Sequence, residues 1–254
     1  MRELQDMSII ITGGGSGIGA GAARYFAARG ALITIAGRRA DKLMAVAEEI
    51  GPRCRAVVAD ITKGEDRKSI ISAALEHGGS IGALVNCAGN MYRGALADLT
   101  EKGLQDVFDS NVIAPMLLTG LAVPHLAEKQ GSVVMFGSVH TRRAYPGASP
   151  YAASRAASEG VTKVLAAELG PLGICVNCVI PGAVPTEINL RAGLFADEES
   201  HLQRLEEMAG SHPLGRIGTV EEIAEGLEYL ICAEWVTGIS LVIDGGLGLG
   251  LTEA

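Results

Sequence analysis

The chain has 254 residues, of which 48% are hydrophobic and 20% are charged, and its formal net charge at pH 7 is −8. This balance is typical of a globular protein with a large core. The negative charge argues against nucleic acid or an anionic membrane surface as a partner. No apolar run approaches the roughly 18 residues needed to cross a bilayer, so we expect no membrane span.

The cysteines and histidines are too scattered to form a recognisable site. The 5 cysteines are odd in number and predict no disulfide framework. The 5 histidines show no metal-ligand spacing, so we expect no metal. No leader-like apolar segment precedes the first strand, and the expected compartment is therefore the reducing cytoplasm.

Strand-like and helical segments alternate along the chain. The predicted strands are residues 8–12, 31–36, 54–59, 82–86, 131–137, 173–179 and 239–243. The predicted helices are residues 18–29, 40–50, 64–77, 100–127, 151–170 and 219–232. Most strands are apolar on both faces, as parallel strands between two helical layers should be. The alternation predicts an α/β fold in a single domain over residues 1–254, a Rossmann-like, doubly wound parallel sheet of about seven strands with helices on both faces.

A glycine-rich turn follows the first strand and leads into an alanine-rich helix. Strand, glycine turn and helix in this order are the context of a dinucleotide-binding fingerprint. Glycine permits a positive φ and lets the backbone approach a pyrophosphate, and the helix start offers free N–H groups. The alternative for such a turn taken alone is a flexible connection. The predicted cofactor contacts in this turn are Gly13, Ser16, Gly17, Ile18 and Gly19.

The end of the second strand bears on the choice of cofactor. A site for NAD(H) would have an acid about twenty residues beyond Gly17 to hold the ribose hydroxyl. This chain has Gly37 at that position, followed by Arg38 and Arg39. Without the acid a 2′-phosphate is not repelled, and a guanidinium can bind it through two hydrogen bonds. The sequence therefore predicts NADP(H), with NAD(H) as the alternative if the two arginines are only solvated surface residues.

The glycine spacing T-G-x-x-x-G-x-G resembles the nucleotide turn of the classical short-chain dehydrogenase/reductase family, and within it the 3-oxoacyl-carrier-protein reductases. Further motifs extend the resemblance from about residue 7 to about residue 248. They are an acid after the third strand, an N-N-A-G-like motif with Cys87 at its second place, and a P-G-x-x-x-T loop. By this resemblance the cofactor site also includes Asp60, Ile61, Asn86, Ala88, Gly89, Pro181, Gly182 and Thr186.

Ser138, Tyr151 and Arg155 are the candidates for chemistry. Ser138 follows a predicted strand, whose carboxyl end should face the ligand crevice. Tyr151 and Arg155 are four residues apart and so share one helix face. The set resembles the family's serine and Y-x-x-x-K. In the family the tyrosine is the general acid or base, the serine hydrogen-bonds the substrate oxygen, and the lysine binds the nicotinamide ribose and lowers the tyrosine pKa.

This chain has Arg155 where the family has lysine. Arginine supplies a positive charge and several donors, so Tyr151 and Arg155 are both expected to contact the cofactor, but a guanidinium does not release its proton. Lys163 lies eight residues further on, roughly 12 Å along the helix, and cannot take the same role. By resemblance, Asn111 is the asparagine whose local helix distortion holds a relay water. We predict an active enzyme, with a cofactor-binding regulatory or structural relative as the alternative.

The C-terminal part divides into a lid and a last crossover. Residues 187–212 match the family's variable substrate lid, after a cofactor-binding part at about 7–185 and before a crossover and final strand at about 213–248. Leu194, Phe195 and Met208 are candidates to line a substrate pocket. The alternative is a surface helix that packs by its apolar side.

The resemblance implies an oxidoreductase that interconverts a secondary alcohol and a ketone by hydride transfer to or from NADP(H). Its expected partners are a small carbonyl or alcohol substrate and further copies of itself, as a homotetramer or homodimer. Arg142 and Arg143 are candidates to attract an acidic or phosphate-bearing substrate, and the alternatives are that they are solvated or pair at a subunit contact. His140 is a candidate to touch the substrate.

Overall fold

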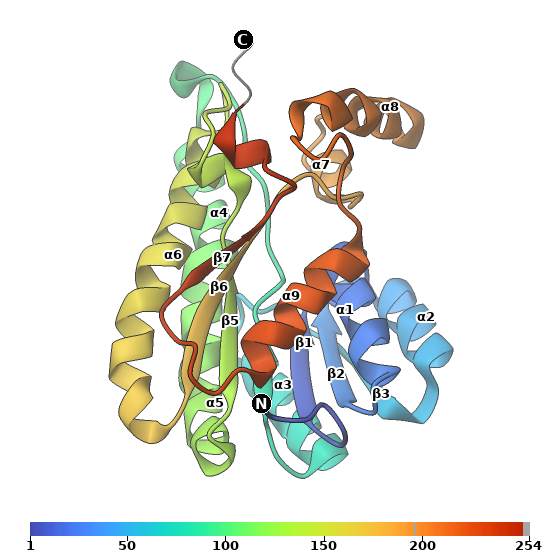
Figure 1. Cartoon of the computed structure of the whole chain (residues 1–254), viewed down its shortest axis with the longest axis vertical. Coiled ribbons are helices and arrows are strands. Elements are labelled where there is room, and N and C mark those ends of the chain that lie inside the picture. Colours follow the sequence, from blue (N-terminus) through green and yellow to red (C-terminus); the bar gives the residue numbers. More distant parts are fainter. Residues whose placement is uncertain (196, 251–254) are drawn as a thin grey trace.

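The computed structural model describes residues 1–195 and 197–250. Within these residues one parallel sheet has the strand order β3-β2-β1-β4-β5-β6-β7 (Figure 1). The strands are β1 (Ser8–Thr12), β2 (Leu32–Gly37), β3 (Cys54–Val58), β4 (Ala83–Val85), β5 (Ser132–Phe136), β6 (Cys175–Pro181) and β7 (Ser240–Ile243). The predicted doubly wound α/β fold is confirmed, and the strand ends differ from the predicted ones by at most two residues.

Helices cover both faces of the sheet. One layer consists of α1 (Gly17–Ala27), α2 (Ala40–Ile50) and α9 (Val220–Cys232), and α9 crosses the front of the sheet in Figure 1. The other layer includes α3 (Gly64–Gly78), α5 (Ala114–Lys129) and α6 (Ser149–Leu169). Side chains alternate along β1, so Ile9 and Ile11 enter the first core and Ile10 the second. This two-sided burial is the reason why the strands read as continuous apolar runs.

The predicted helix at residues 100–127 is interrupted. It consists of α4 (Glu101–Phe108), a π-helical turn (Asp109–Ile113) and α5. Thr100 caps it, because its Oγ1 accepts a hydrogen bond of 3.1 Å from the N–H of Gly103. Pro115 lies in the first turn of α5, where a missing N–H is tolerated, and Pro124 lies inside α5 without ending it.

The continuous stretch Glu101–Lys129 is long and apolar enough to cross a membrane, judged by length and composition alone. The expectation that no segment reaches this length was therefore wrong. The core helix of a globular protein passes the same test, and Leu118, Ala122 and Leu126 of this stretch are fully buried against the sheet.

The carboxyl ends of the strands meet at one edge of the sheet, where ligands bind in doubly wound folds. The chain order reverses beside β1, whose neighbours are β2 and β4. Two lid helices, α7 (Ile188–Arg191) and α8 (Glu198–Met208), stand beyond this edge (Figure 1). The fold thus leaves a space between the strand ends and the lid.

Candidate active site

Two cavities meet at the carboxyl edge of the sheet. The first has a volume of about 480 Å³ and extends from the turn after β1 to the ends of β5 and β6. The second has a volume of about 690 Å³ and lies under the lid. Ser138, Tyr151 and Thr186 line both cavities. A group bound in one cavity therefore meets a group bound in the other at Ser138 and Tyr151.

The turn after β1 presents bare backbone to the first cavity. Gly13 and Gly17 have φ values of +71° and +52°, which favour glycine. A Cβ on Gly13 would lie 2.9 Å from the Cα of Ala88, and a Cβ on Gly19 would overlap the carbonyl of Gly13. No side-chain cap occupies the start of α1. Its N–H groups are therefore available to an anion, and the cradle fits the pyrophosphate of a dinucleotide.

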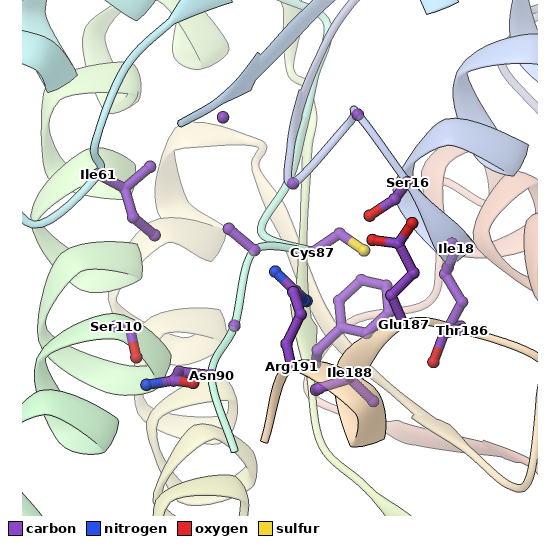
Figure 2. Close-up of a pocket in the computed structure, with 18 of the residues that line it drawn as sticks. Ser16, Ile18, Ile61, Cys87, Asn90, Ser110, Thr186, Glu187, Ile188 and Arg191 are labelled. Carbon is purple, nitrogen blue, oxygen red and sulfur yellow. The ribbon is translucent and has the colours of Figure 1, made fainter. Parts of the chain in front are cut away.

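One end of the first cavity gathers positive charge. Arg38, Arg39 and Ser16 line it, as the sequence predicts, together with Arg191 of α7 (Figure 2). Arg39 donates one hydrogen bond of 2.7 Å to Ser16 Oγ and another of 2.6 Å to Glu187 Oε2. Sequence reasoning missed Arg191 and Glu187, because only the folded lid brings them to this end of the cavity.

The carboxylate of Glu187 lies beside Ser16, at the end of the cavity where a cofactor phosphate is expected (Figure 2). Burial raises the pKa of Glu187, but the hydrogen bond and charge of Arg39 outweigh it and hold this pKa below its ordinary value. Glu187 is therefore ionised at neutral pH. It competes with any bound phosphate for Arg39.

The opposite wall holds the residues predicted to flank the adenine. The Oδ1 atom of Asp60 accepts hydrogen bonds of 3.0 and 2.8 Å from the N–H and hydroxyl of Thr62. Ile61 lines the cavity next to it (Figure 2). Burial raises the pKa of Asp60, but the two Thr62 bonds and nearby cations bring the net value below the ordinary one. The carboxylate therefore stays ionised and fixed in orientation.

The N-N-A-G-like turn closes the cavity behind the glycine turn. The N–H of Ala88 donates a hydrogen bond of 3.0 Å to Thr12 Oγ1, which fixes the turn against β1. Asn86 does not line the cavity, because its buried side chain donates to Thr119 Oγ1 at 3.2 Å. Cys87 does line it, and burial raises the pKa of its thiol to about 12. Cys87 is thus a neutral thiol in the wall.

Ser138 stands at the end of β5, where it caps a short turn. Its Oγ accepts a hydrogen bond of 3.3 Å from the N–H of His140 and lies 3.1 Å from Nδ1 of the same residue. The His140 ring packs at 4.4 Å from Tyr145 and meets the edge of Tyr151 at 5.1 Å, measured between ring centroids. Burial, assisted by the charges of Arg93 and Arg155, lowers the pKa of His140 to about 4. The imidazole is therefore neutral at physiological pH.

Tyr151 and Arg155 lie on one face of α6, as their spacing predicts. Their exposed fractions are 6% and 4%. The guanidinium carbon of Arg155 lies 5.1 Å from the centroid of the Tyr151 ring, and Nη1 donates a hydrogen bond of 3.1 Å to the carbonyl of Phe136. A Cβ on Gly89 would overlap Nη2. The guanidinium is thus wedged at the floor of the first cavity, beside the tyrosine.

The Nε atom of Arg155 is buried and has no hydrogen-bond partner among the described groups. An unpaired buried donor of this kind is costly. Lys163, by contrast, is exposed on α6 and lines neither cavity.

Asn111 lies behind the cavity wall, within a π-helical turn, where the family resemblance implies a local helix distortion. Its Nδ2 donates hydrogen bonds of 2.9 Å to the carbonyl of Asn90 and 3.0 Å to Ser154 Oγ, and its Oδ1 accepts one of 2.8 Å from the N–H of Asn90. These bonds tie the loop after β4 to α6. Asn111 thereby fixes the wall on which Tyr151 and Arg155 stand.

The second cavity is lined by the predicted lid residues Leu194, Phe195 and Met208. Leu202, which continues the same apolar pattern in the sequence, has a side chain outside those that the structure describes. Arg142 and Arg143 line neither cavity, and Glu159 holds the guanidinium of Arg142 in an ion pair. Of the alternatives open for these two arginines, a place at the substrate is therefore not supported. Two other arginines, Arg93 and Arg204, line the second cavity instead.

Fold and site together define a dinucleotide-binding oxidoreductase with a tyrosine and a serine between its cofactor and substrate cavities. A family model described as "Enoyl-(Acyl carrier protein) reductase" matches residues 13–248. The chain belongs to the short-chain dehydrogenase/reductase family. It is 34% identical to Dehydrogenase/reductase SDR family member 4 of Homo sapiens over 93% of this chain and 86% of that protein. It is 32% identical to L-fucose dehydrogenase of Bos taurus over 95% of this chain and 89% of that protein.

Solved structures agree with this assignment. A short-chain dehydrogenase/reductase of Caenorhabditis elegans with cofactor superposes with a TM-score of 0.92, at 30% identity over 98% of both chains. The 3-ketoacyl-(acyl-carrier-protein) reductase of Brucella melitensis, complexed with NADH, superposes with a TM-score of 0.88, at 30% identity over 97% of this chain and 100% of that one. The protein is thus a dehydrogenase/reductase of alcohol or ketone substrates that uses a nicotinamide dinucleotide.

Proposed function

We propose that this protein is an NADP(H)-dependent oxidoreductase that interconverts a secondary alcohol and a ketone. Tyr151 is its general acid or base, Ser138 holds the reacting oxygen, and Arg155 takes the role of the family's lysine. The observation that carries the proposal is that both cavities share Ser138 and Tyr151, with Arg155 wedged beneath on the cofactor side.

A bound nicotinamide dinucleotide supplies or accepts the hydride. The bare backbone from Gly13 to Gly19 would hold its pyrophosphate, with Asp60 and Ile61 beside the adenine and Thr186 toward the nicotinamide. Arg38, Arg39 and Ser16 would hold a 2′-phosphate, and Gly37 offers no carboxylate to repel it. These features support NADP(H) over NAD(H), and tighter binding of NADH than of NADPH in a direct titration would contradict the preference. The observed lid contact means that Glu187 must release Arg39 when a phosphate binds there.

In the reduction, Tyr151 donates a proton to the carbonyl oxygen, and the charge of Arg155 stabilises the phenolate that remains. Arg155 keeps its own proton, so Tyr151 is reprotonated by water or by a hydroxyl of the ligand. Ser138 Oγ accepts hydrogen bonds from the backbone N–H and, in the Nδ1-protonated tautomer, from the ring of His140. The hydrogen of the Ser138 hydroxyl is then left to donate to the substrate oxygen. His140 is in this view a positioning residue for Ser138.

Two exposed apolar surfaces support a homotetramer or homodimer. On the α5 side, Leu117 and Leu121 are exposed, and Trp235 near β7 is 99% exposed. Large apolar side chains that are exposed to solvent in groups are typical of protein contacts. Light scattering on the native protein and on Trp235→Glu would test this arrangement. The five free cysteines fit the reducing cytoplasm that we propose as its compartment.

The deciding test is NADPH oxidation with activated ketones and 3-oxoacyl thioesters, by the native protein, Tyr151→Phe and Arg155→Lys. We expect turnover by the native protein and a loss of about 100-fold or more in Tyr151→Phe, with NADPH binding retained. Unchanged catalysis in Tyr151→Phe would refute the assignment of the acid. Activity that appears only in Arg155→Lys would instead support a cofactor-binding relative that has lost catalysis.

A further inference from the structure

We infer that the second cavity takes an oxo acid, a carbonyl substrate that also carries a carboxylate, and that Arg93 binds this carboxylate. The inference rests on the proposed function, because it names the substrate class of the same site. The inference goes beyond the proposed function, because it assigns a third point at which the substrate is held, away from Ser138 and Tyr151.

The charge lining the second cavity is the first observation. The chain as a whole carries a net charge of −8. Yet the charged side chains that line this cavity in the described part of the chain are Arg93 and Arg204, and no aspartate or glutamate joins them. The charges of Arg93 and Arg155 both lower the pKa of His140, whose ring lies in the cavity wall. The reacting end of the cavity is therefore positive, which favours an anionic substrate.

The way in which Arg93 is held is the second observation. Its Nη2 donates a hydrogen bond of 2.9 Å to the carbonyl of Pro146, and the N–H of Gly94 bonds the carbonyl of Gly147 at 2.9 Å. These two bonds join the loop after β4 to the loop before α6. Arg93 is thus a half-buried residue at the cavity wall, and its guanidinium is anchored through one nitrogen by a neutral group.

Three other arginines around the site have carboxylate partners. Arg39 pairs with Glu187, Arg142 with Glu159, and Arg204 with Glu207. None of the ion pairs found in residues 1–195 and 197–250 involves Arg93. Its Nε and Nη1 are not used by the bond to Pro146. Nη2 shares one edge of the planar guanidinium with Nε and the other edge with Nη1. Because the bond to Pro146 uses only one of the two Nη2 hydrogens, one of these edges keeps two donors, which suits a carboxylate bound through two hydrogen bonds.

The remaining wall describes the body of the substrate. It is mostly apolar, and its apolar residues include Met91, Leu194, Phe195, Leu205, Met208 and Leu247. A volume of about 690 Å³ lies within the range that holds a whole small-molecule ligand. The cavity therefore fits a molecule with its ketone at Ser138 and Tyr151, an apolar chain or ring against the lid, and its carboxylate at Arg93.

Turnover of matched substrate pairs tests the inference. Straight-chain oxo acids with the ketone two to five carbons from the carboxylate would be compared with their primary amides, which keep the shape and remove the charge. We expect native protein to prefer the acid, and Arg93→Gln to lower kcat/KM for the acid about 10- to 100-fold, mainly through KM, while the amide is unaffected. Arg142→Gln is the matched control, and we expect it to change kcat/KM for the acid less than threefold, because Arg142 lines neither cavity and is paired with Glu159.

Equal kcat/KM for acid and amide in the native protein would overturn the inference and leave the proposed function standing. A higher kcat/KM for neutral 3-oxoacyl pantetheine thioesters than for every oxo acid would also overturn the inference and leave the proposed function standing. A binding measurement tests the inference without any turnover. By calorimetry with NADPH present, octanoate should bind native protein at least about 10-fold more tightly than octanamide, and Arg93→Gln should remove the difference. Equal binding of the two by native protein overturns the inference even if no ketone is reduced.

Discussion

The two cavities differ in what builds their walls. In the cofactor cavity the wall at the turn after β1 is backbone, because the glycines at positions 13, 17 and 19 leave no space for side chains. The substrate cavity is formed by side chains from the loop after β4, the loop before α6, the lid and residue 247. A wall of backbone recognises what all dinucleotides share, whereas a wall of side chains can differ in every member of a family. The cofactor side therefore identifies the class of enzyme, and the lid side contains its specificity.

The largest expected effect tests whether backbone really forms the cofactor wall. In Gly19→Ala the new Cβ would overlap the carbonyl of Gly13, so the turn must shift. We expect the Kd for NADPH to rise by about 100-fold or more. Gly160→Ala is the matched control, because a Cβ there meets nothing within 4 Å. It should leave the Kd unchanged and raise the free energy of unfolding by up to about 1 kcal/mol. Native affinity in Gly19→Ala would mean that the pyrophosphate binds elsewhere.

The second prediction concerns the junction of the cavities. His140→Leu removes the contact between Nδ1 and Ser138 Oγ, and we expect kcat to fall about 10-fold, since one neutral hydrogen bond that orients the serine is lost. Asparagine places its amide where Nδ1 lies, whereas glutamine reaches the position of Nε2. His140→Asn should therefore retain most of kcat, and His140→Gln should not.

A purely structural role of His140 would affect the two amide variants through stability alone. The control is thus thermal unfolding of each variant, with kcat and KM measured separately. If His140→Asn and His140→Gln lose kcat equally, the ring does not act through Ser138.

The third prediction tests the contact between the lid and the cofactor cavity. Glu187→Gln removes the negative charge that competes with a phosphate for Arg39. We expect the Kd for NADPH to fall about 3- to 10-fold, while the Kd for NADH changes less. Glu49→Gln, which alters the surface pair of Glu49 with Arg24, is the control. Equal changes for both cofactors would show that Arg39 does not bind the 2′-phosphate.

The smallest effect concerns the support behind the cofactor wall. Glu222 closes a capping box with Thr219 at the start of α9, and α9 packs against α1 at Gly21. The guanidinium of Arg216, followed by the N–H of Thr219, lowers the pKa of Glu222 to about 2. A lowered pKa in the folded state means that the stabilisation is complete above the ordinary pKa of about 4.3 and is lost as the pH falls toward 2.

We therefore expect Glu222→Gln to lower the free energy of unfolding by about 1 kcal/mol at pH 7. In urea titrations the difference from native protein should shrink below pH 4 and vanish near pH 2. A difference that is the same at pH 7 and pH 3 would mean that the charge of Glu222 is not what stabilises the cap.

Much of the fold follows from local patterns in the sequence. Apolar runs bounded by glycine turns identify all the strands of the described sheet, because each strand is buried on both faces. The places of Gly13, Ser138, Tyr151 and Arg155 at the cavities were also predictable. Each depends on a short spacing, such as the four residues that put Tyr151 and Arg155 on one helix face.

The partners of individual side chains were decided by the tertiary structure. A substrate contact was one of the alternatives for Arg142, yet it pairs with Glu159, while Arg93 lines the cavity without a carboxylate partner among the residues described. Arg39 meets Glu187 across 148 positions of sequence. A charged side chain pairs with whichever group the fold brings within about 4 Å, and its own sequence neighbourhood does not contain that distance. The sequence by itself determined the sheet and the chemistry at its edge, and only the packed lid and loops decided which charges remain free for a substrate.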